Sequence, residues 1–314
     1  MTVYRTVLEA ELTPIAGSLI QPTGFPDLGA AEFGDGKLLV ESAQSMANWL
    51  ESTTWDAGGN DQAPELASAS VPYVRVVDPQ GNFLSSSRLE AHRLASAYIM
   101  NGVPAGEQTT GEKWLEDRLQ LVKGRPLDYR AVARACFRLD PVSLVHGVFF
   151  ARKNWPWQPK IARAVTSFIE ASDIKPAVSG GVKKDGVINE AKGGATAEGY
   201  GTVPHHRVEY TTGTITAYFT VDHAQFRSYG LSEPATALLE AIADFEIASL
   251  LDRGMRLRTR CDLIVSDIIK GERPDAADAA ARIAKFAADC QRELDPITEV
   301  TWSESARAAK PSKG

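Results

Sequence analysis

The sequence predicts an α+β protein, and three observations lead to that class. Segments with alternating apolar and polar residues, typical of strands, stand between segments with apolar residues every three or four positions, typical of helices. The chain has 314 residues, 44% of them hydrophobic and 24% charged, so it can bury a full core. The order of these segments is strand, long connection, helix and strand, followed by further helices and hairpins, which favours a ferredoxin-like domain with insertions.

The first elements follow from local pattern. Residues 3 to 12 alternate and predict the first strand. After a loop of prolines and glycines, ESAQSMANWLE repeats apolar residues at helical spacing and predicts a helix with a small, polar outer face. The segment VPYVRVVD predicts a strand over 71 to 78. In SRLEAHRLASAYIM, Glu90 follows Ser87 by three residues, a capping box that predicts a helix starting there.

Later elements are assigned in the same way. EKWLEDRLQL and DYRAVARACF predict helices, and SLVHGVFFA resembles a strand. HHRVEY, the turn TTGT and ITAYFTVD predict a hairpin. Ser232 and Pro234 open a strongly apolar helix that ends at Gly254. MRLRTRCDLIVS predicts a strand, and a last helix is expected at about 275 to 291.

The domain organisation expected from these elements is a single domain over 1–292. Within it, residues 174–204 are rich in glycine and lysine and have few apolar residues, so they form an insertion without a core of its own. Residues 293–314 read as a polar C-terminal tail.

Charge is sorted along the chain although its net value is −6. Residues 151–207 hold nine Lys or Arg against five acids, and residues 253–273 hold six against three. An acidic total argues against a simple nucleic-acid binder, whereas this segregation is compatible with one basic groove on an acidic body. No signal-peptide pattern and no run of eighteen apolar residues is visible, so a cytoplasmic protein without a membrane partner is expected.

The sequence lacks the motifs of disulfide frameworks, structural metal sites, hydrolases and nucleotide-binding proteins. Cys136, Cys261 and Cys290 form no CxxC pair and are expected to be buried thiols, and the five histidines lack metal-ligand spacing. The hydrolase, dinucleotide and nucleotide-triphosphate motifs GxSxG, GxGxxG and GxxxxGK[ST] are absent. No metal and no cofactor is therefore predicted, and a metabolic enzyme is disfavoured.

Two segments carry alternative readings. Arg256, Arg258 and Arg260 would form a row along one strand, which suits a phosphate backbone or else a solvated sheet face paired with carboxylates. In FFARKNWPWQPK, cations stand beside two tryptophans. These tryptophans either clamp single-stranded bases or anchor a proline-rich turn in the core.

The opening stretch, residues 19 to 56, also has two interpretations. Hydroxyl and amide side chains at a helix start, next to a glycine-containing loop, can present hydrogen-bond donors to phosphates without a formal charge. They can equally cap the helix and pack a strand-to-helix crossover. Asp27 lies in this loop, and a lone carboxylate there could hold a metal or move a proton.

At these residues the chain resembles a known family. The segments QPTGFPDLGAAEF, LLVESAQSMANWLE, PYVRV and SSRLEAHRLASAYI are similar, in order and spacing, to the CRISPR-associated RAMP superfamily protein of the seventh Cas family. That protein forms the backbone of the type I-G effector, formerly called type I-U. The similarity is dense over about residues 5 to 100 and continues more loosely to about 270.

The resemblance implies a modified RNA-recognition-type fold, with a palm and inserted fingers and thumb. It implies a non-enzymatic subunit that polymerises along a CRISPR guide RNA and presents it to target DNA in antiviral defence. The implied partners are further copies of the chain and other Cascade subunits, namely a fused subunit of the fifth and sixth Cas families and a large subunit, and a helicase-nuclease of the third Cas family. The alternative is a metal-dependent ribonuclease that cuts target RNA through Asp27, as related subunits of type III effectors do.

Candidate guide contacts come from two sources. The motifs of the resemblance supply Gln21, Thr23, Ser42, Gln44, Ser45 and Asn48. Charge reasoning alone supplies Arg152, Lys153, Arg163, Lys183, Lys184 and His206.

Overall fold

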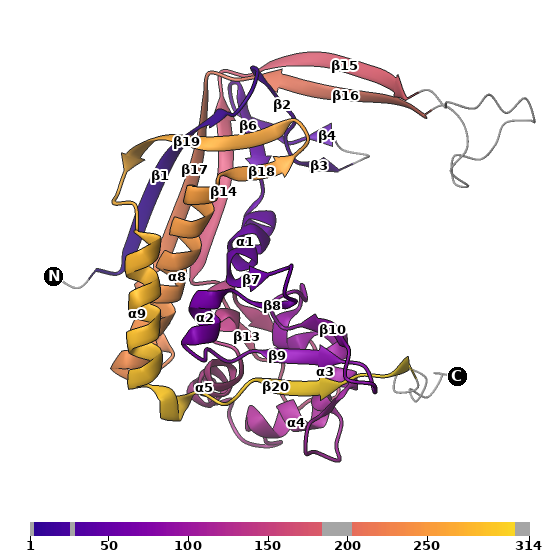
Figure 1. Cartoon of the computed structure of the whole chain (residues 1–314), viewed down its shortest axis with the longest axis vertical. Coiled ribbons are helices and arrows are strands. Elements are labelled where there is room, and N and C mark those ends of the chain that lie inside the picture. Colours follow the sequence, from indigo (N-terminus) through magenta and orange to yellow (C-terminus); the bar gives the residue numbers. More distant parts are fainter. Residues whose placement is uncertain (1–2, 26–28, 184–202, 305–314) are drawn as a thin grey trace, which may run out of the picture.

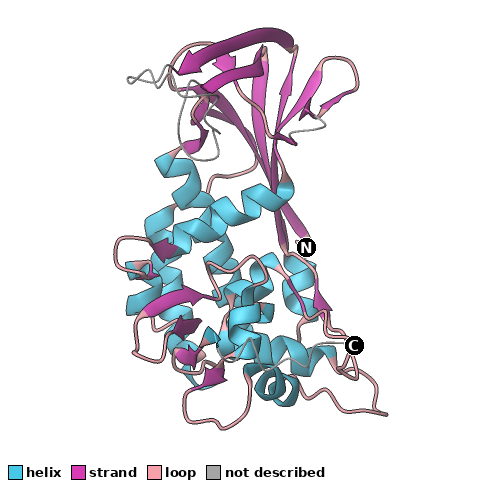
Figure 2. Ribbon diagram, turned by 90° about the vertical axis from the view of Figure 1, so that its right-hand side faces the viewer, coloured by secondary structure: helices cyan, strands magenta, loops and turns pink. Residues whose placement is uncertain are grey.

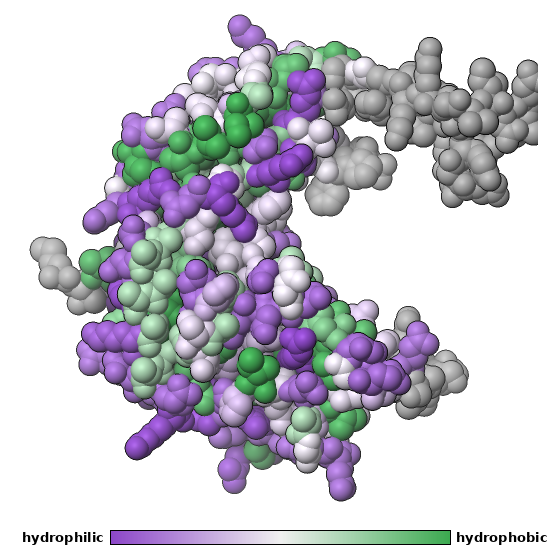
Figure 3. Space-filling model, in the orientation of Figure 1, coloured by the Kyte–Doolittle hydropathy of each residue, from purple (hydrophilic) through white to green (hydrophobic). Residues whose placement is uncertain are grey.

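The computed structural model describes residues 3–25, 29–183 and 203–304. Figure 1 shows an elongated molecule with a large sheet in its upper part, and short helices and a small sheet in its lower part. Two long helices, α8 (Glu233–Arg253) and α9 (Ala276–Asp289), lie along one side. The opposite side is hollowed between the upper and lower parts, as Figure 3 shows.

The large sheet is curled, and all its neighbouring strand pairs are antiparallel. In spatial order its seven strands are β18 (Met255–Arg258), β19 (Cys261–Lys270), β1 (Arg5–Pro14), β17 (Thr214–Asp222), β14 (Val165–Ser172), β6 (Lys37–Glu41) and β5 (Glu32–Phe33). Strands from both ends of the chain therefore lie side by side.

Among the described residues, helices cover one face of this sheet and leave the other uncovered. Along β17, Ile215, Ala217 and Phe219 are buried, whereas Thr216 and Tyr218 between them are partly exposed. Helix α1 (Ala43–Glu51) contacts β14 and α8 contacts β19 on the buried face, and Figure 2 shows the helices to one side of the long strands. The alternation predicted from the sequence for this strand is confirmed.

Helix α8 begins and ends where its sequence signals predict. The Ser232 Oγ accepts a hydrogen bond from the N–H of Ala235 at 3.3 Å, and Pro234 lies in the first turn. Gly254 ends the helix with φ +72°, and a Cβ there would lie 3.0 Å from the carbonyl oxygen of Leu263. Helix α9 packs along α8, and its first turn is capped by Asp275.

The lower part contains a four-stranded sheet and several short helices. The sheet order is β10 (Phe83–Ser86), β9 (Val74–Val77), β20 (Thr298–Thr301) and β11 (Val103–Pro104). The helices are α2 (Pro64–Ser68), α3 (Ala97–Asn101), α4 (Gly111–Arg118), α5 (Tyr129–Leu139), α6 (Val142–His146) and α7 (His223–Ser228). Two short pairs complete it, β7 (Trp55–Asp56) with β8 (Asp61–Gln62), and β12 (Val148–Phe149) with β13 (Lys160–Ile161).

The glycine-rich insertion leaves the sheet as a long hairpin. Its arms are β15 (Lys175–Lys183) and β16 (Val203–Thr211), which project from the upper part in Figure 1. The short strand β2 (Leu19–Ile20) pairs with the base of β16, and β3 (Gly24–Phe25) pairs with β4 (Gly29–Ala30) nearby in the chain. Residues 184–202 between the two arms lie outside the described residues.

The α+β class is confirmed, and so are most of the elements with strong local patterns. The predicted strands at 3 to 12 and 71 to 78 correspond to β1 and β9, and the helix in the opening stretch is α1. The segments EKWLEDRLQL, DYRAVARACF and 275 to 291 contain α4, α5 and α9.

Five expectations about elements are wrong, one of which is the single strand at MRLRTRCDLIVS, because β18 ends at Arg258 and β19 begins at Cys261. The capping box at Ser87 does not form, because the Ser87 Oγ accepts from the N–H of Val74 at 3.1 Å while Glu90 binds Ser85 and Ser96. The helix in that segment is only α3, capped by Ser96.

The other corrections concern pairing and length. The segment SLVHGVFFA is half helix, since Gly147 at φ +80° ends α6 before β12 starts. HHRVEY and ITAYFTVD do not pair with each other, because β16 joins β15 and β2 whereas β17 joins β1 and β14. The first part of the expected tail is structured, because β20 lies between β9 and β11 with Val300 fully buried.

The three cysteines are buried free thiols, as the sequence predicts. Burial raises the pKa of Cys261 to about 11 and that of Cys290 to about 11, and it raises the pKa of Cys136 further. In the described ranges, no helix combines the length and apolar character that crossing a membrane requires.

Candidate nucleic-acid interface

The opening stretch is held in place by Arg258 of β18. The Nε of Arg258 donates to the carbonyl of Gln21 at 2.9 Å, and Nη2 donates to the carbonyl of Val40 at 2.7 Å. The same guanidinium pairs with the buried carboxylate of Glu41. The N–H of Thr23 donates to the carbonyl of Val40 at 2.8 Å. Hydrogen bonds therefore fix the backbones of Gln21 and Thr23, the two predicted RNA contacts in this stretch, while their side chains are partly exposed.

Helix α1 presents a row of uncharged polar side chains. Its first turn is capped by Ser42, whose Oγ accepts from the N–H of the partly exposed Ser45 at 3.2 Å. Gln44, Asn48 and Ser52 follow at four-residue intervals, and all three are exposed. Four residues span about 6 Å along a helix, so these side chains share one edge. We call the row of Gln44, Asn48 and Ser52 the α1 edge. Figure 1 labels helix α1, and Figure 3, in the same orientation, shows the hollow next to that position.

An arginine stands at each end of the α1 edge. Arg163 donates to the carbonyl of Ala43 at 3.2 Å and to the side-chain oxygen of Gln44. Arg253 donates to the Ser52 Oγ at 2.7 Å and to the carbonyl of Trp49 at 3.2 Å. Among the described residues neither guanidinium forms an ion pair with a carboxylate, so both keep an uncompensated charge next to the edge.

The Arg163 side chain also faces a pocket of about 370 Å³. Its cationic lining consists of Arg93, Lys160 and Arg163, and His92 lies on the same wall. No carboxylate is among the described residues that line it. Partial burial lowers the pKa of Arg163, and the neighbouring charge of Arg93 lowers it further, so this site would be stabilised by an anion.

The pocket also contains an exposed ring. Phe149 is 47% exposed, and the Nζ of Lys160 lies 5.9 Å from its ring centroid. Glu51 compensates the charge of Arg93, whereas Lys160 and Arg163 form no ion pair among the described residues. An exposed ring with two such cations can contact both the base and the phosphate of a nucleotide.

In the segment FFARKNWPWQPK, the two tryptophans have different environments. Trp155 is buried and its ring stacks on Phe150 with centroids 5.9 Å apart, so this residue anchors the core. Arg152 lies 3.8 Å from a carboxylate oxygen of Glu112, and Lys153 is exposed. The idea that both tryptophans clamp bases is therefore wrong for Trp155.

The predicted arginine row does not exist either. Residues 255–258 and 261–270 are two strands joined by a turn, so the three arginines do not share a strand. Arg256 lies 4.0 Å from Asp262, Arg258 pairs with Glu41, and Arg260 lies 3.6 Å from Glu209. The alternative, in which carboxylates compensate these charges, describes them correctly.

Four candidates lie wholly or partly outside the described residues. The backbone of Lys183 pairs with Val203 on the hairpin, and that of His206 pairs with Gly180, but the positions of their side chains lie outside what the structure describes. Lys184 and Asp27 lie outside the described residues altogether. In the described part of the chain, no three His, Cys, Asp or Glu side chains are grouped as metal ligands.

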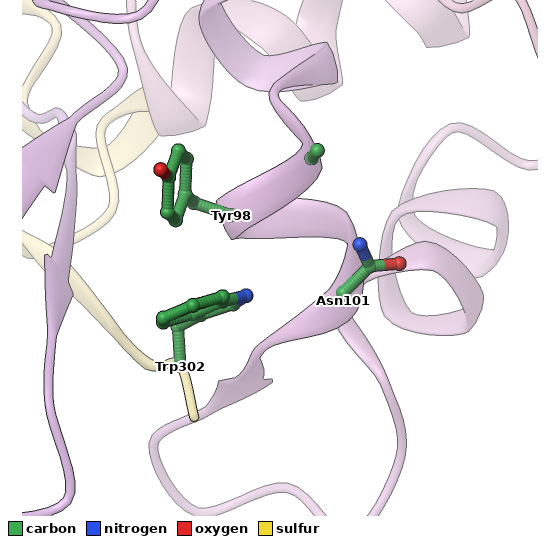
Figure 4. Close-up of a pocket in the computed structure, with 4 residues that line it drawn as sticks. Tyr98, Asn101 and Trp302 are labelled. Carbon is green, nitrogen blue, oxygen red and sulfur yellow. The ribbon is translucent and has the colours of Figure 1, made fainter. Parts of the chain in front are cut away.

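A second pocket has a different character (Figure 4). It has a volume of about 280 Å³ and is lined by Ala97, Tyr98, Asn101 and Trp302. The rings of Tyr98 and Trp302 meet edge to face, with centroids 5.0 Å apart. Since no charged residue is among its described lining residues, this lining does not favour a phosphate.

Six residues of this interface are not among the predicted contacts, namely Ser52, His92, Arg93, Phe149, Lys160 and Arg253. Lys160 and Arg253 belong to the basic segments recognised by their composition, and His92 and Arg93 belong to the segment SSRLEAHRLASAYI. No local signal distinguished them from neighbouring cations, because their position beside α1 depends on contacts between segments far apart in the chain.

The comparisons with known proteins assign the chain to a class, the CRISPR-associated proteins. The family described as CRISPR-associated protein GSU0053 matches residues 6–176, more than half of the chain, and the chain belongs to this family. No curated protein matches the chain. Among solved structures, it is similar to a chain of one described as "CRISPR RNA-guided surveillance complex, pre-nicking". The identity is 13%, the match covers 92% of this chain and 89% of that one, and the TM-score is 0.40.

Proposed function

We propose that the chain is a non-enzymatic subunit of a type I-G Cascade complex and forms the backbone along which the guide RNA lies. Membership of a CRISPR-associated family supports the general role. The α1 edge with Arg163 and Arg253 at its ends supports the RNA contact. This uncharged row with flanking cations is the observation on which the proposal depends.

The chemistry of the edge suits a ribose-phosphate backbone. Gln44 and Asn48 can donate to phosphate oxygens and accept from 2′-hydroxyls, while the two guanidinium groups supply charge. Contacts of this kind fix the position of a strand and leave the base edges free. A subunit that leaves the bases free can present the guide for pairing with target DNA.

The fold proposed for this role is a modified RNA-recognition-type palm. The large sheet with α1 and α8 on one face would be the palm, and the β15–β16 hairpin would belong to the finger or thumb. Further copies of the chain and other Cascade subunits are the proposed partners, together with a helicase-nuclease of the third Cas family. A cytoplasmic location accords with this role.

The test changes the charge of the α1 edge with little change of shape. The variant Gln44→Glu with Asn48→Asp places two carboxylates where phosphates would lie. Like charges in contact disfavour binding strongly, so we expect guide affinity to fall by about tenfold or more. The measurement is the RNA retained after co-expression with a CRISPR array, followed by filter binding of the purified complex.

The matched control is Gln80→Glu with Gln291→Glu, which adds the same charge at two exposed positions away from the edge. Equal RNA retention by the two double variants would contradict a contact at the α1 edge. Absence of RNA from the unmodified protein would contradict the function itself.

The ribonuclease alternative is tested separately. The assembled complex is incubated with complementary RNA and magnesium. Cleavage that disappears on Asp27→Ala would contradict the non-enzymatic role.

A further inference from the structure

A group of unpaired cations lies on the loop before α5 and on the first turns of that helix. Lys123 and Arg125 belong to the loop, and Arg130 and Arg134 lie one turn apart on α5. All four residues are exposed, and within the described ranges none of them forms an ion pair with a carboxylate. We call these four residues the α5 basic surface.

The carboxylates of Asp295 and Asp128 already have other partners. Arg118 and Arg138, which flank this segment in the chain, both pair with Asp295. Asp128 is the one acid between Val122 and Arg134, and its Oδ1 accepts from the N–H groups of residues 130 and 131 at 2.9 and 3.1 Å. The carboxylate thus caps α5 and forms no ion pair with these cations within the described ranges, so four cations stand against one acid on a chain whose net charge is −6.

Two exposed aromatic side chains accompany these cations. Tyr129 is 57% exposed and immediately precedes Arg130. Trp157 is 40% exposed, and its Nε1 donates to the carbonyl of Arg125 at 2.9 Å, which holds the indole against the loop. The second tryptophan of FFARKNWPWQPK is therefore on the surface, and it is bonded to the backbone of the loop that carries Lys123 and Arg125.

Cations and exposed rings together indicate the ligand. Phosphates bind the cations, and unpaired bases stack on the rings without regard to sequence. A duplex keeps its bases stacked inside and would leave both rings unused. An acidic protein segment would use the cations, but carboxylates alone do not stack on the rings as bases do.

We infer that the α5 basic surface, with Tyr129 and Trp157, binds a single-stranded nucleic acid independently of its sequence. Figure 1 places α5 in the lower part of the molecule, below α1, and the two helices belong to different segments of the chain. The surface is thus additional to the proposed guide contact and provides a place for a second strand.

The test measures binding of a labelled oligothymidylate by fluorescence anisotropy across a salt series, with the full chain. Arg130→Gln with Arg134→Gln removes two charges from the surface and leaves the Asp128 cap in place. Each lost phosphate contact lowers the slope of log affinity against log salt by about 0.7 for a single strand, so we expect a decrease of about 1.4. The control, Arg256→Gln with Lys285→Gln, removes the same charge from other exposed positions and should leave the slope unchanged.

A second pair of variants examines the ring. Trp157→Ala should weaken binding by about tenfold, since stacking on an aromatic side chain is lost, whereas Trp157→Phe should retain most of the affinity. Circular dichroism and thermal melting check that each variant is folded.

Equal slopes and affinities for the surface variants and their control would overturn the inference. If the Gln44 and Asn48 variant alone lost nucleic-acid binding, the inference would fail and the proposed function would stand. If the surface variants alone lost oligothymidylate binding, the inference would stand whatever the outcome at the α1 edge. Binding of an acidic peptide with no binding of oligothymidylate would also overturn it.

Discussion

At the scale of single residues, Arg93 connects the interface to the core. Its Nε and Nη2 donate to the two carboxylate oxygens of Glu51 at 2.6 Å each, and Nη1 donates to the carbonyl of Gly147 at 2.9 Å. Both charged side chains are 7% exposed. Arg93 adopts φ +50°, which non-glycine residues rarely do, so the surrounding contacts hold it there. The pair fixes the last turn of α1 against the wall of the basic pocket.

Removing this arginine is expected to be costly. Arg93→Met leaves Glu51 charged and buried without a partner, and we expect the free energy of unfolding to fall by about 3–5 kcal/mol. Urea denaturation at pH 7 measures the change. Lys113→Met is the control, because Lys113 pairs with Glu116 and Asp117 on an exposed helix face, where a pair contributes about 1 kcal/mol or less.

A double variant separates the cost of the unpaired Glu51 charge from the cost of losing the Arg93 contacts. Arg93→Met with Glu51→Leu removes the unpaired charge and should recover part of the stability. If Arg93→Met and Lys113→Met lowered the free energy of unfolding by the same small amount, the Arg93–Glu51 pair would not fix the last turn of α1 against the pocket wall.

At the scale of elements, the β15–β16 hairpin depends on few contacts with the rest of the molecule. Its base pairs with β2 through Tyr210 and Thr211, and Tyr210 is buried. Farther out, Val178 and Val208 face each other across the hairpin and are exposed. By contrast, β17 is paired on both sides and buries every second side chain.

Hydrogen exchange should show this difference. Amides of β15 and β16 beyond Val178 and Val208 are expected to exchange through local opening, whereas amides of β17 should exchange only through global unfolding. Mass spectrometry of the peptides gives both rates, and the amide of Tyr210 serves as the protected reference within the hairpin. Equal protection along the whole hairpin and in β17 would contradict the prediction.

At the scale of the whole molecule, the C-terminal segment connects the upper and lower parts. Helix α9 packs on α8 and on α2, and β20 then enters the small sheet parallel to β9. Strand β11 pairs with β20 alone in the described sheet, so the order of that sheet depends on β20.

Two truncations compare the contribution of β20 to thermal stability with that of the residues after it. Removing 296–314 takes away β20 and exposes the apolar residues that Val300 covers, so we expect Tm to fall by about 5 °C or more. Removing 305–314 should leave Tm unchanged within experimental error. Differential scanning calorimetry of both proteins provides the comparison, and equal melting temperatures would refute a structural role for β20.

Much of the fold could be predicted because its signals are local. The alternation in β1 and β17, the cap at Ser232 and the stop at Gly254 lie within a few residues of the elements they define. The candidate site was predicted in part for the same reason, since Gln44 and Asn48 belong to one helical edge. Ser87 and Glu90 show the limit of such signals. Their spacing is that of a capping box, but the Ser87 Oγ accepts from the N–H of Val74 in another strand, and Glu90 accepts from Ser96 instead of capping a helix.

The sequence by itself determined the α+β class, the main elements, the buried thiols and the resemblance to a Cas family. Only the tertiary structure decided which charges stay uncompensated. Arg163 reaches Gln44 across 119 residues of chain, and Arg258 reaches Glu41 across 217. Charge compensation depends on distances between segments that fold together, and the order of residues along the chain does not encode those distances directly.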